Sequence, residues 1–212
     1  MDKIFDSFYN LYEKEKLFPP KENIALPFKY FSDKIKCVFI VDYINENGIP
    51  LHSSNVSKKY MEQEILLESL INDPYIKKPK QITLTNSYSL EKWFDQGILI
   101  IPSLFVDIKK ATQDIKNIIK TLSELIIKKV IDDLKNKHIC YVLIGNESKK
   151  YEKIINQYNN LVIPLSKLDK YTQKNDSSKQ VKNLIAMKIF TIINNFLKSF
   201  NIDEINWMSI YY

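Results

Sequence analysis

The sequence predicts an α/β fold in which a central four-stranded parallel sheet is flanked by helices. Four short, continuously apolar segments have the length of strands buried on both faces, at residues 36–41, 98–101, 139–144 and 161–163. They alternate with segments whose apolar residues recur at helical spacing, as in strands joined by crossover helices. The chain is long enough for one sizeable core and shows no repeat or boundary, so we expect a single domain over residues 1–212.

The N-terminal elements follow from periodicity and from proline positions. Residues 2–16 predict an amphipathic helix that Pro19 and Pro20 end, and residues 21–35 predict an irregular connection. Asp42 comes directly after the first strand. The apolar face of this first helix has five members: Ile4, Phe5, Phe8, Leu11 and Tyr12.

The middle of the chain predicts a second helix and the second strand. After a loop over residues 43–56, a helix begins near Ser57 and stops before Pro74, because a residue that precedes proline disfavours helical backbone. A basic loop over residues 74–82 follows, and Leu90, Trp93 and Phe94 then form a helical turn that Gly97 ends. Pro102 ends the second strand because proline has no N–H to give to a sheet.

The C-terminal half predicts two further strands and three helices. A long amphipathic helix spans residues 112–135, a short helix spans 151–158, and the last helix spans 181–200. The third strand ends at Gly145, the fourth ends at Pro164, and residues 165–180 form a polar loop. The buried stripe expected for the long helix has six members: Ile115, Ile118, Ile119, Leu122, Leu125 and Ile126.

Composition restricts the possible ligands. All 31 basic residues are lysine, and the formal net charge is +6, so any nucleic-acid binding should be led by the phosphate backbone and weakly sequence-specific. Three isolated glycines build neither a dinucleotide fingerprint nor a phosphate-binding loop, and a zinc site would need more ligands than two cysteines and two histidines offer here. We therefore expect no cofactor and no metal.

Localisation is predicted from the same composition. Cys37 and Cys140 lie in apolar strands, which indicates buried, reduced thiols in a cytoplasmic protein. No apolar run is long enough to span a membrane, and the charged N-terminus is unlike a signal peptide.

Segments along most of the chain resemble one enzyme family in the same order. Trp93 with residues 96–101 (QGILII) is similar to the segment WAxQGVLLLN of the uracil-DNA glycosylases. The other similarities are residues 37–43 with the strand entering GQDPY, residues 48–59 with the poxvirus-type continuation, residues 142–150 with LWG…KK, residues 162–166 with HPSPLS, and residues 205–207 with I-[DN]-W. The resemblance implies a uracil-DNA-glycosylase-like fold, closest to the poxvirus-type glycosylases that double as polymerase processivity subunits.

The resemblance also implies a degenerate pocket made of Asp42, Tyr43, Leu51, Pro102 and Ile163. The family stacks a flipped uracil on an aromatic ring, reads it with Asn, orients water with Asp and stabilises the departing anion with His. Asp42 keeps the water-orienting position, whereas Leu51, Pro102 and Ile163 replace the aromatic, the Asn and the His. Tyr43 lacks its preceding Pro, so it need not point into the pocket. These losses predict a protein without glycosylase activity, with Asp42 as a vestigial site residue.

Two further candidates for catalysis are weak. His52 lies in a loop with no acidic partner nearby in the sequence, and Ser103 lacks a nucleophile-elbow motif. His138 precedes a strand and is expected at the surface. Pro102, Ser103 and Leu104, at the end of the second strand, are still expected to line the ligand crevice, because ligands bind at the carboxyl ends of parallel strands.

A DNA-binding surface is predicted from lysines and tyrosines in loops around this crevice. Single-strand binders combine a cationic groove with aromatic rings on which bases stack. The candidates are Lys58, Lys59, Tyr75, Lys77, Lys78, Lys80, Lys149, Lys150, Lys167, Lys170, Tyr171 and Lys174.

The leading hypothesis from the sequence is therefore an inactive glycosylase relative that binds single-stranded DNA during replication of an AT-rich viral or linear-plasmid element. Two alternatives stay open. One is a divergent, active uracil-DNA glycosylase, which the retained Asp42 favours. The other is a scaffold that tethers a DNA polymerase or another replication protein, which exposed aromatic residues between Trp207 and Tyr212 would favour.

Overall fold

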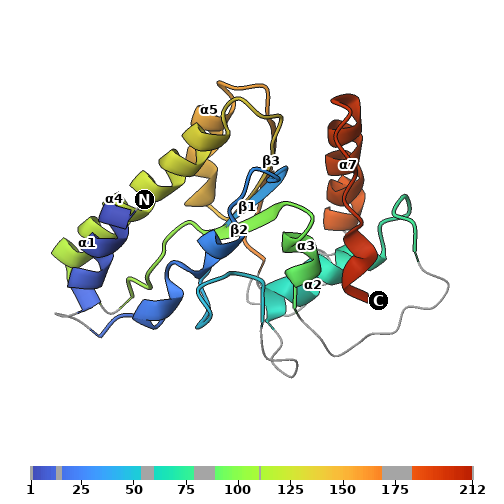
Figure 1. The fold of residues 1–212 in the computed structure, drawn as a ribbon. Helices are drawn as coiled ribbons and strands as arrows, with labels where there is room; N and C mark the ends of the chain where they lie inside the picture. Colours follow the sequence, from blue (N-terminus) through green and yellow to red (C-terminus); the bar gives the residue numbers. More distant parts are fainter. Residues whose placement is uncertain are drawn as a thin grey trace.

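Four parallel strands form a single sheet with helices on both faces, as the sequence predicts (Figure 1). The computed structural model describes residues 2–12, 16–53, 60–78, 89–109, 111–168 and 183–211. The strands are β1 (Cys37–Val41), β2 (Ile98–Pro102), β3 (Cys140–Ile144) and β4 (Leu161–Leu165).

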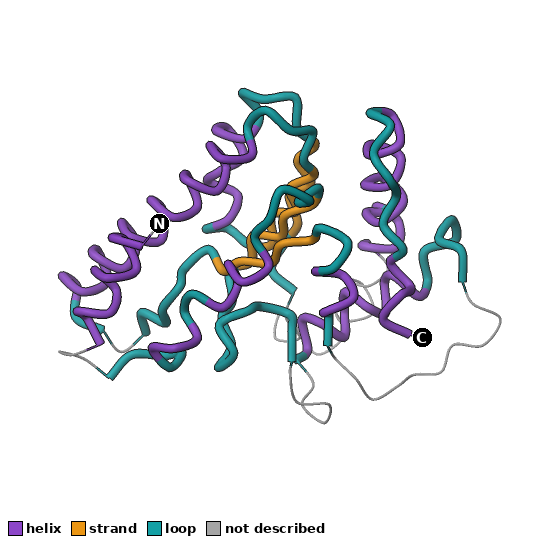
Figure 2. The backbone as a smooth tube through the Cα atoms, viewed as in Figure 1, coloured by secondary structure: helices purple, strands orange, loops and turns teal. Residues whose placement is uncertain are grey.

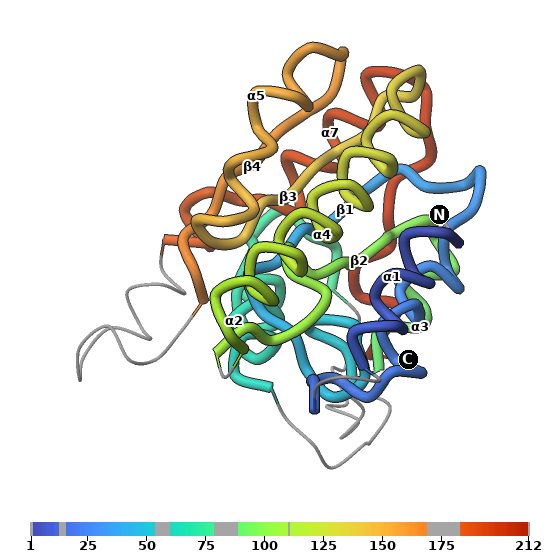
Figure 3. The backbone as a smooth tube through the Cα atoms, turned by 90° about the vertical axis from the view of Figure 1, so that its left-hand side faces the viewer, coloured from blue at the N-terminus to red at the C-terminus, as the bar shows by residue number. Residues whose placement is uncertain are grey.

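The strands lie side by side in the order β2-β1-β3-β4, so β1 and β3 are central. Their labels follow one another across Figure 3 in this order. Cys37 is in register with Ile98 on one side and with Cys140 on the other, and both cysteines are buried free thiols. Because all four strands run in the same direction, their carboxyl ends meet at one edge of the sheet, where a ligand crevice is expected.

One face of the sheet is covered by α1 (Asp2–Tyr12) and α4 (Gln113–Leu134), which lie to the left of the strands in Figure 1. Helix α1 buries Phe5, Phe8 and Leu11, three of its five predicted residues. The predicted stripe of α4 is wrong at two positions, because Ile118 and Leu125 are 43% and 47% exposed. The buried face of α4 is instead made of Ile119, Ser123, Ile126, Ile127, Val130, Ile131 and Leu134.

The other face is covered by α2 (Met61–Ile71), α3 (Glu91–Phe94), α7 (Ile189–Ser199) and the 3-10 helix η4 (Trp207–Tyr211). Figure 2 shows these helices and α1/α4 on opposite sides of the strands. The rings of Trp93, Phe190 and Trp207 pack against one another, and Trp93 Nε1 donates to the Trp207 carbonyl at 2.9 Å. Trp207 and Tyr211 are buried, so the described part of the C-terminal aromatic cluster packs in the core; Tyr212 lies outside the described residues.

Several predicted boundaries differ from the observed ones. The connection at 21–35 contains two 3-10 helices, η1 (Lys21–Asn23) and η2 (Leu26–Tyr30), and the short helix after β3 consists of η3 (Ser148–Tyr151) and α5 (Glu152–Ile155). Strand β4 continues through Pro164 because it is an edge strand, where a missing N–H is tolerated.

The last predicted helix is divided at Lys188. Residues 183–187 are helical, and α7 begins at Ile189. Lys188 separates them with φ 52° and ψ 44°, a left-handed conformation that ends one helix before the next begins. Within the described ranges, no helix is both long and apolar enough to cross a membrane.

Candidate active-site cleft

A cleft of about 420 Å³ opens where β1 and β2 end. Its walls come from the loops after these strands, from the start of α2, from the segment after β3 and from the segment after β4. Four carboxylates and two lysines give it a mixed charge. The lining residues are Asp42, Tyr43, Ile44, Glu62, Ser103, Leu104, Val106, Asp107, Ile108, Lys109, Glu147 and Lys167.

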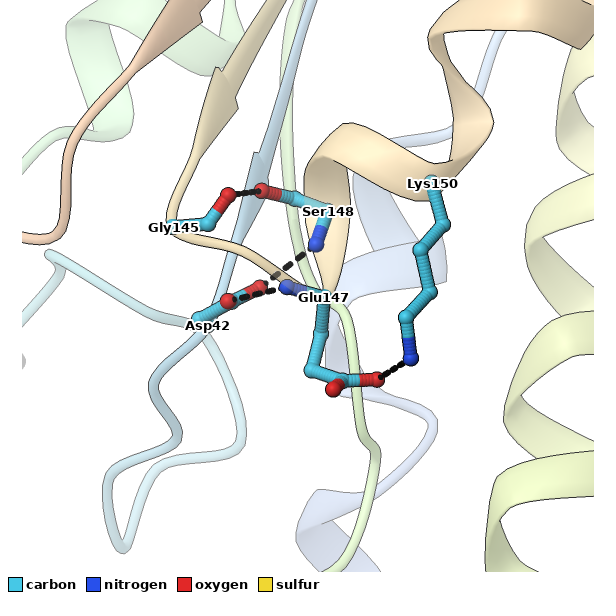
Figure 4. Close-up of polar contacts among 5 residues, drawn as sticks. All are labelled: Asp42, Gly145, Glu147, Ser148 and Lys150. Atoms are coloured by element: carbon cyan, nitrogen blue, oxygen red, sulfur yellow. Dashed lines mark hydrogen bonds and ion pairs between the residues drawn. The ribbon is translucent and has the colours of Figure 1, made fainter.

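Asp42 is held rigidly at the end of β1 (Figure 4). Its two carboxylate oxygens accept hydrogen bonds from the backbone N–H groups of Glu147 and Ser148, at 2.6 and 2.7 Å. Hydrogen bonds to an ionised carboxylate are among the stronger ones in proteins, and two of them fix the orientation of the group. Asp42 therefore reaches the cleft as a preorganised carboxylate.

Gly145 makes this arrangement possible. Its φ is +108°, and a Cβ atom built on it would lie 2.3 Å from Oδ2 of Asp42, closer than real side chains approach. Ser148 Oγ also donates to the Gly145 carbonyl at 3.0 Å, which closes the turn after β3. Any side chain at position 145 would displace the carboxylate of Asp42.

Tyr43 lies on the wall of the cleft beside Asp42, although nothing in the sequence required it to point there. Its ring makes an edge-to-face contact with Tyr60, with 6.0 Å between centroids. Burial, and then the negative charge of Glu62, raise the pKa of Tyr43 far above its ordinary value. The phenol therefore stays protonated at neutral pH and can donate a hydrogen bond.

The other three residues of the predicted pocket lie elsewhere. Leu51 and Ile163 are buried in the core on the α2/α7 side of the sheet, and Pro102 is buried within β2. None of the three belongs to the cleft lining, whereas Ser103 and Leu104, directly after Pro102, do. The side chains of residues 51, 102 and 163 are buried and do not line this cleft, and their assignment to a degenerate pocket stays a prediction.

Sequence reasoning found part of the lining and missed the rest. Asp42, Tyr43, Ser103, Leu104 and Lys167 were expected at the crevice or in the predicted pocket. Residues missed were Ile44, Glu62, Val106, Asp107, Ile108, Lys109 and Glu147. The available signal was the position of Ile44, Asp107 and Glu147 after β1, β2 and β3, because residues past a strand end tend to face a crevice. Nothing in the sequence placed the start of α2 opposite β1.

The predicted DNA-binding residues divide into three groups and one single residue, Lys149. Lys167 lines the cleft, and Lys150 is paired with Glu147 at its edge. Tyr75, Lys77 and Lys78 are exposed beyond the end of α2. The remaining group, Lys58, Lys59, Lys80, Lys170, Tyr171 and Lys174, lies outside the described residues, and Lys149 is half-buried in η3.

Neither histidine is placed for catalysis. His52 is buried, its Nδ1 accepts the backbone N–H of Leu90 at 3.1 Å, and its burial lowers its pKa. His138 is at the surface as predicted and stacks on Phe200, with 3.6 Å between ring centroids. No group of three or more potential metal ligands occurs among the described residues.

Known proteins similar to this chain are uracil-DNA glycosylases. A uracil-DNA glycosylase from Dictyostelium discoideum is 26% identical over 210 residues, which cover 92% of this chain and 54% of that protein. The chain thus spans about half the length of this curated relative. No family model matches the sequence.

Solved structures agree in fold. Mimivirus uracil-DNA glycosylase has a TM-score of 0.68 at 16% identity, covering 93% of this chain and 76% of that one. A variant of mimivirus UNG in complex with UGI gives 0.67 at 17% identity, covering 93% and 78%, and wild-type UNG from Nitratifractor salsuginis gives 0.54 at 11%, covering 89% and 84%. The closer likeness to the poxvirus branch stays a prediction.

These comparisons contradict the prediction that the chain is not an enzyme, because its relatives are named uracil-DNA glycosylases. That prediction depended on Leu51 and Ile163, which lie in the core, and on Pro102, which is buried within β2; none of the three lines the cleft. This chain therefore has the uracil-DNA glycosylase fold, and along 92% of its length it is similar in sequence to a curated uracil-DNA glycosylase.

Proposed function

We propose that this chain is a divergent uracil-DNA glycosylase that takes a flipped base into the cleft at the ends of β1 and β2. The observation that carries the proposal is the carboxylate of Asp42, fixed by two backbone N–H groups on the wall of a cleft of about 420 Å³. Such preorganisation matters for catalysis because the group spends no energy on reorienting as the reaction proceeds.

In the proposed reaction, the N-glycosidic bond breaks and its electron pair leaves with the base. A water oxygen bonds to C1′ of the sugar, and Asp42 orients this water and accepts its proton. The negative carboxylate also faces the positive charge that develops on the sugar. Both roles depend on the fixed position of the Asp42 carboxylate, which its two hydrogen bonds from backbone N–H groups maintain.

Lys167 is the group best placed to stabilise the departing base as an anion. Its side chain is exposed on the cleft, and it forms no hydrogen bond or ion pair with any other described residue that would fix its ammonium elsewhere. A cation aimed at developing negative charge is a common way to lower a barrier of this kind. In this proposal, Lys167 performs the task that the family's histidine performs.

The first prediction tests this function with uracil release from single-stranded and duplex oligonucleotides. We expect release by the wild type and a loss of about 100-fold or more for Asp42→Asn, the range typical of general-base removal. Asp107→Asn is the matched control, because it removes a second carboxylate from the same cleft and should leave most activity.

The side-chain amide introduced by Asp42→Asn has one oxygen and can replace only one of the two carboxylate acceptors, so this variant must also be checked for folding by thermal melting. Lys167→Ala should lower kcat, and Lys167→Met, which keeps the length without the charge, should do the same. Wild-type protein that releases no uracil, or a folded Asp42→Asn variant as active as wild type, would overturn the proposal.

A preference for single-stranded DNA without sequence specificity is part of the proposal. Lysine contacts phosphate as a point charge, and the chain has no arginine for bidentate reading of guanine. A place in the replication of an AT-rich element, and a polymerase partner, stay predictions.

A further inference from the structure

We propose that Tyr75, Lys188 and the neighbouring lysines Lys77 and Lys78 form a second contact surface for single-stranded DNA, beyond the far end of α2 from the cleft. This surface, the Tyr75 platform, extends the proposed function by naming where a strand continues once its base is in the cleft. Only the path of the strand between the cleft and this surface depends on the proposed glycosylase function.

The Tyr75 platform combines an exposed ring with cations. Tyr75 is 65% exposed, more than any other large hydrophobic side chain among the described residues, and the Nζ atom of Lys188 lies 4.4 Å from its ring centroid. Lys77 and Lys78 are exposed two and three residues further along the chain. The ring can stack on a base, and the ammonium groups can contact the phosphates beside it. Proteins that bind single strands without sequence preference combine these two contacts.

The loop that carries Tyr75 is fixed to α7. The Tyr75 backbone N–H donates to Oδ1 of Asp73 at 3.0 Å, and the Thr191 hydroxyl lies 3.0 Å from each oxygen of the same carboxylate. Asp73 is only 1% exposed. The buried carboxylate therefore ties two segments far apart in the sequence, and holds the ring beside Lys188 before any ligand arrives.

The backbone of Lys188 gives an independent reason to assign a function here. Lys188 has φ 52° and ψ 44°, a left-handed conformation that glycine or asparagine adopts at much lower cost than lysine. Strained residues of this kind concentrate at functional sites. A lysine at this junction places a cation over the Tyr75 ring, although glycine would adopt the same backbone conformation at a lower cost in free energy.

The distance from the cleft suits a bound strand. Glu62, in the first turn of α2, lines the cleft, and Tyr75 follows the other end of this helix of 11 residues. Such a helix is about 16 Å long. A strand with one base in the cleft would cover that distance in roughly five nucleotides at about 3.4 Å each.

The test measures binding of a uracil-free, fluorescently labelled oligothymidylate by anisotropy at several salt concentrations, so that glycosylase activity plays no part. Tyr75→Ala should weaken binding about 10-fold, within the range for one stacked base. Lys188→Gly should weaken binding and lower the slope of log K against log salt by about 0.7, the value for one phosphate on a single strand.

Lys188→Gly has a matched control in Asn201→Gly. Asn201 also has a positive φ, 56°, at the end of α7, but carries no charge. Lys188→Gly should melt at or above the wild-type temperature because the left-handed strain of lysine is relieved, and Asn201→Gly should change the melting temperature little because asparagine already adopts this conformation at low cost. Only Lys188→Gly should bind DNA less well. Thr191→Val removes the hydrogen bonds to Asp73 but does not change the side chains of Tyr75 and Lys188. It should therefore cause a smaller loss of affinity than Tyr75→Ala or Lys188→Gly.

Wild-type affinity in folded Tyr75→Ala and Lys188→Gly variants would overturn the assignment, as would tighter binding of an RNA oligomer of matching sequence. If the wild type releases no uracil but these variants lose affinity as expected, the Tyr75 platform stands and only the proposed glycosylase function falls.

Discussion

At the scale of single residues, Leu51 stands where the resemblance implies a stacking aromatic, and its surroundings in the structure are those of a core residue. It is fully buried in the core with a left-handed backbone, φ 63°, and it does not line the cleft. A side chain held in this way contributes packing, whereas an aromatic platform for a base has to face the ligand. Its replacement should therefore affect stability and leave ligand binding unchanged.

We predict that Leu51→Ala lowers the free energy of unfolding by about 2–5 kcal/mol, as removal of a buried leucine does elsewhere. Leu51→Met, which conserves volume, should cost less than about 1.5 kcal/mol. Urea denaturation measures both values. A base-stacking role for Leu51 would instead appear as weaker DNA binding by the stable Leu51→Met variant.

His52 makes a second residue-scale prediction, on pH. Burial lowers its pKa in the folded state, with the charge of Glu91 opposing this, so the unfolded chain binds a proton more readily. Stability is therefore fully present above the unfolded pKa of about 6.5 and is lost as the pH falls below it toward the lowered folded value.

The measurement is the free energy of unfolding between pH 5 and pH 8 (roughly the range in which histidine titrates). His52→Asn keeps an acceptor for the Leu90 N–H and removes the titration, so its profile should be flatter than that of the wild type. Equal slopes in the two proteins would mean that another group causes the pH dependence.

At the scale of elements, α4 shows how helical periodicity leaves the buried face undetermined. Ile118, Ile119, Leu125 and Ile126 form adjacent pairs, and the sequence alone does not say which member of each pair faces the sheet. The buried face is identified by Ser123, whose buried hydroxyl accepts a hydrogen bond from the backbone N–H of Phe105 at 3.2 Å. The face that contains Ser123 is the one that packs on the sheet.

We predict that Ile126→Ala costs about 2–5 kcal/mol of unfolding free energy, the range for a buried isoleucine. The matched change at an exposed position, Leu125→Ala, should stay within about 0.5 kcal/mol of wild type. Chemical denaturation of the two variants tests the orientation of α4. Equal losses at 125 and 126 would place both side chains in the core.

At the scale of the whole molecule, the lysine-only positive charge predicts how DNA binding depends on salt. The formal net charge of +6 favours association with phosphates, and each one neutralised on a single strand should contribute about −0.7 to the slope of log K against log salt. We expect a steep slope and similar affinities for oligomers of different base composition. Anisotropy titrations at several salt concentrations measure the slope, and an affinity that does not change with salt would exclude a backbone-led interface.

The sequence by itself determined the four parallel strands, the helices between them and the position of Asp42 at the end of β1. These features follow from the local spacing of apolar residues and from proline and glycine, which act within a few residues of where they stand. The common order of the family-like segments along the chain also indicated the glycosylase fold. Lys167 was found because it follows the last strand of the same sheet.

Only the tertiary structure decided which side chains share a site. It brings Glu62 of α2 and Glu147 beside Asp42, turns Leu51 and Ile163 into the core, and places Lys188 over the ring of Tyr75. Each of these outcomes depends on how segments far apart in the sequence pack and rotate against one another. Periodicity within one segment specifies a face that must be buried, and the partner that buries it is fixed only when the whole core assembles.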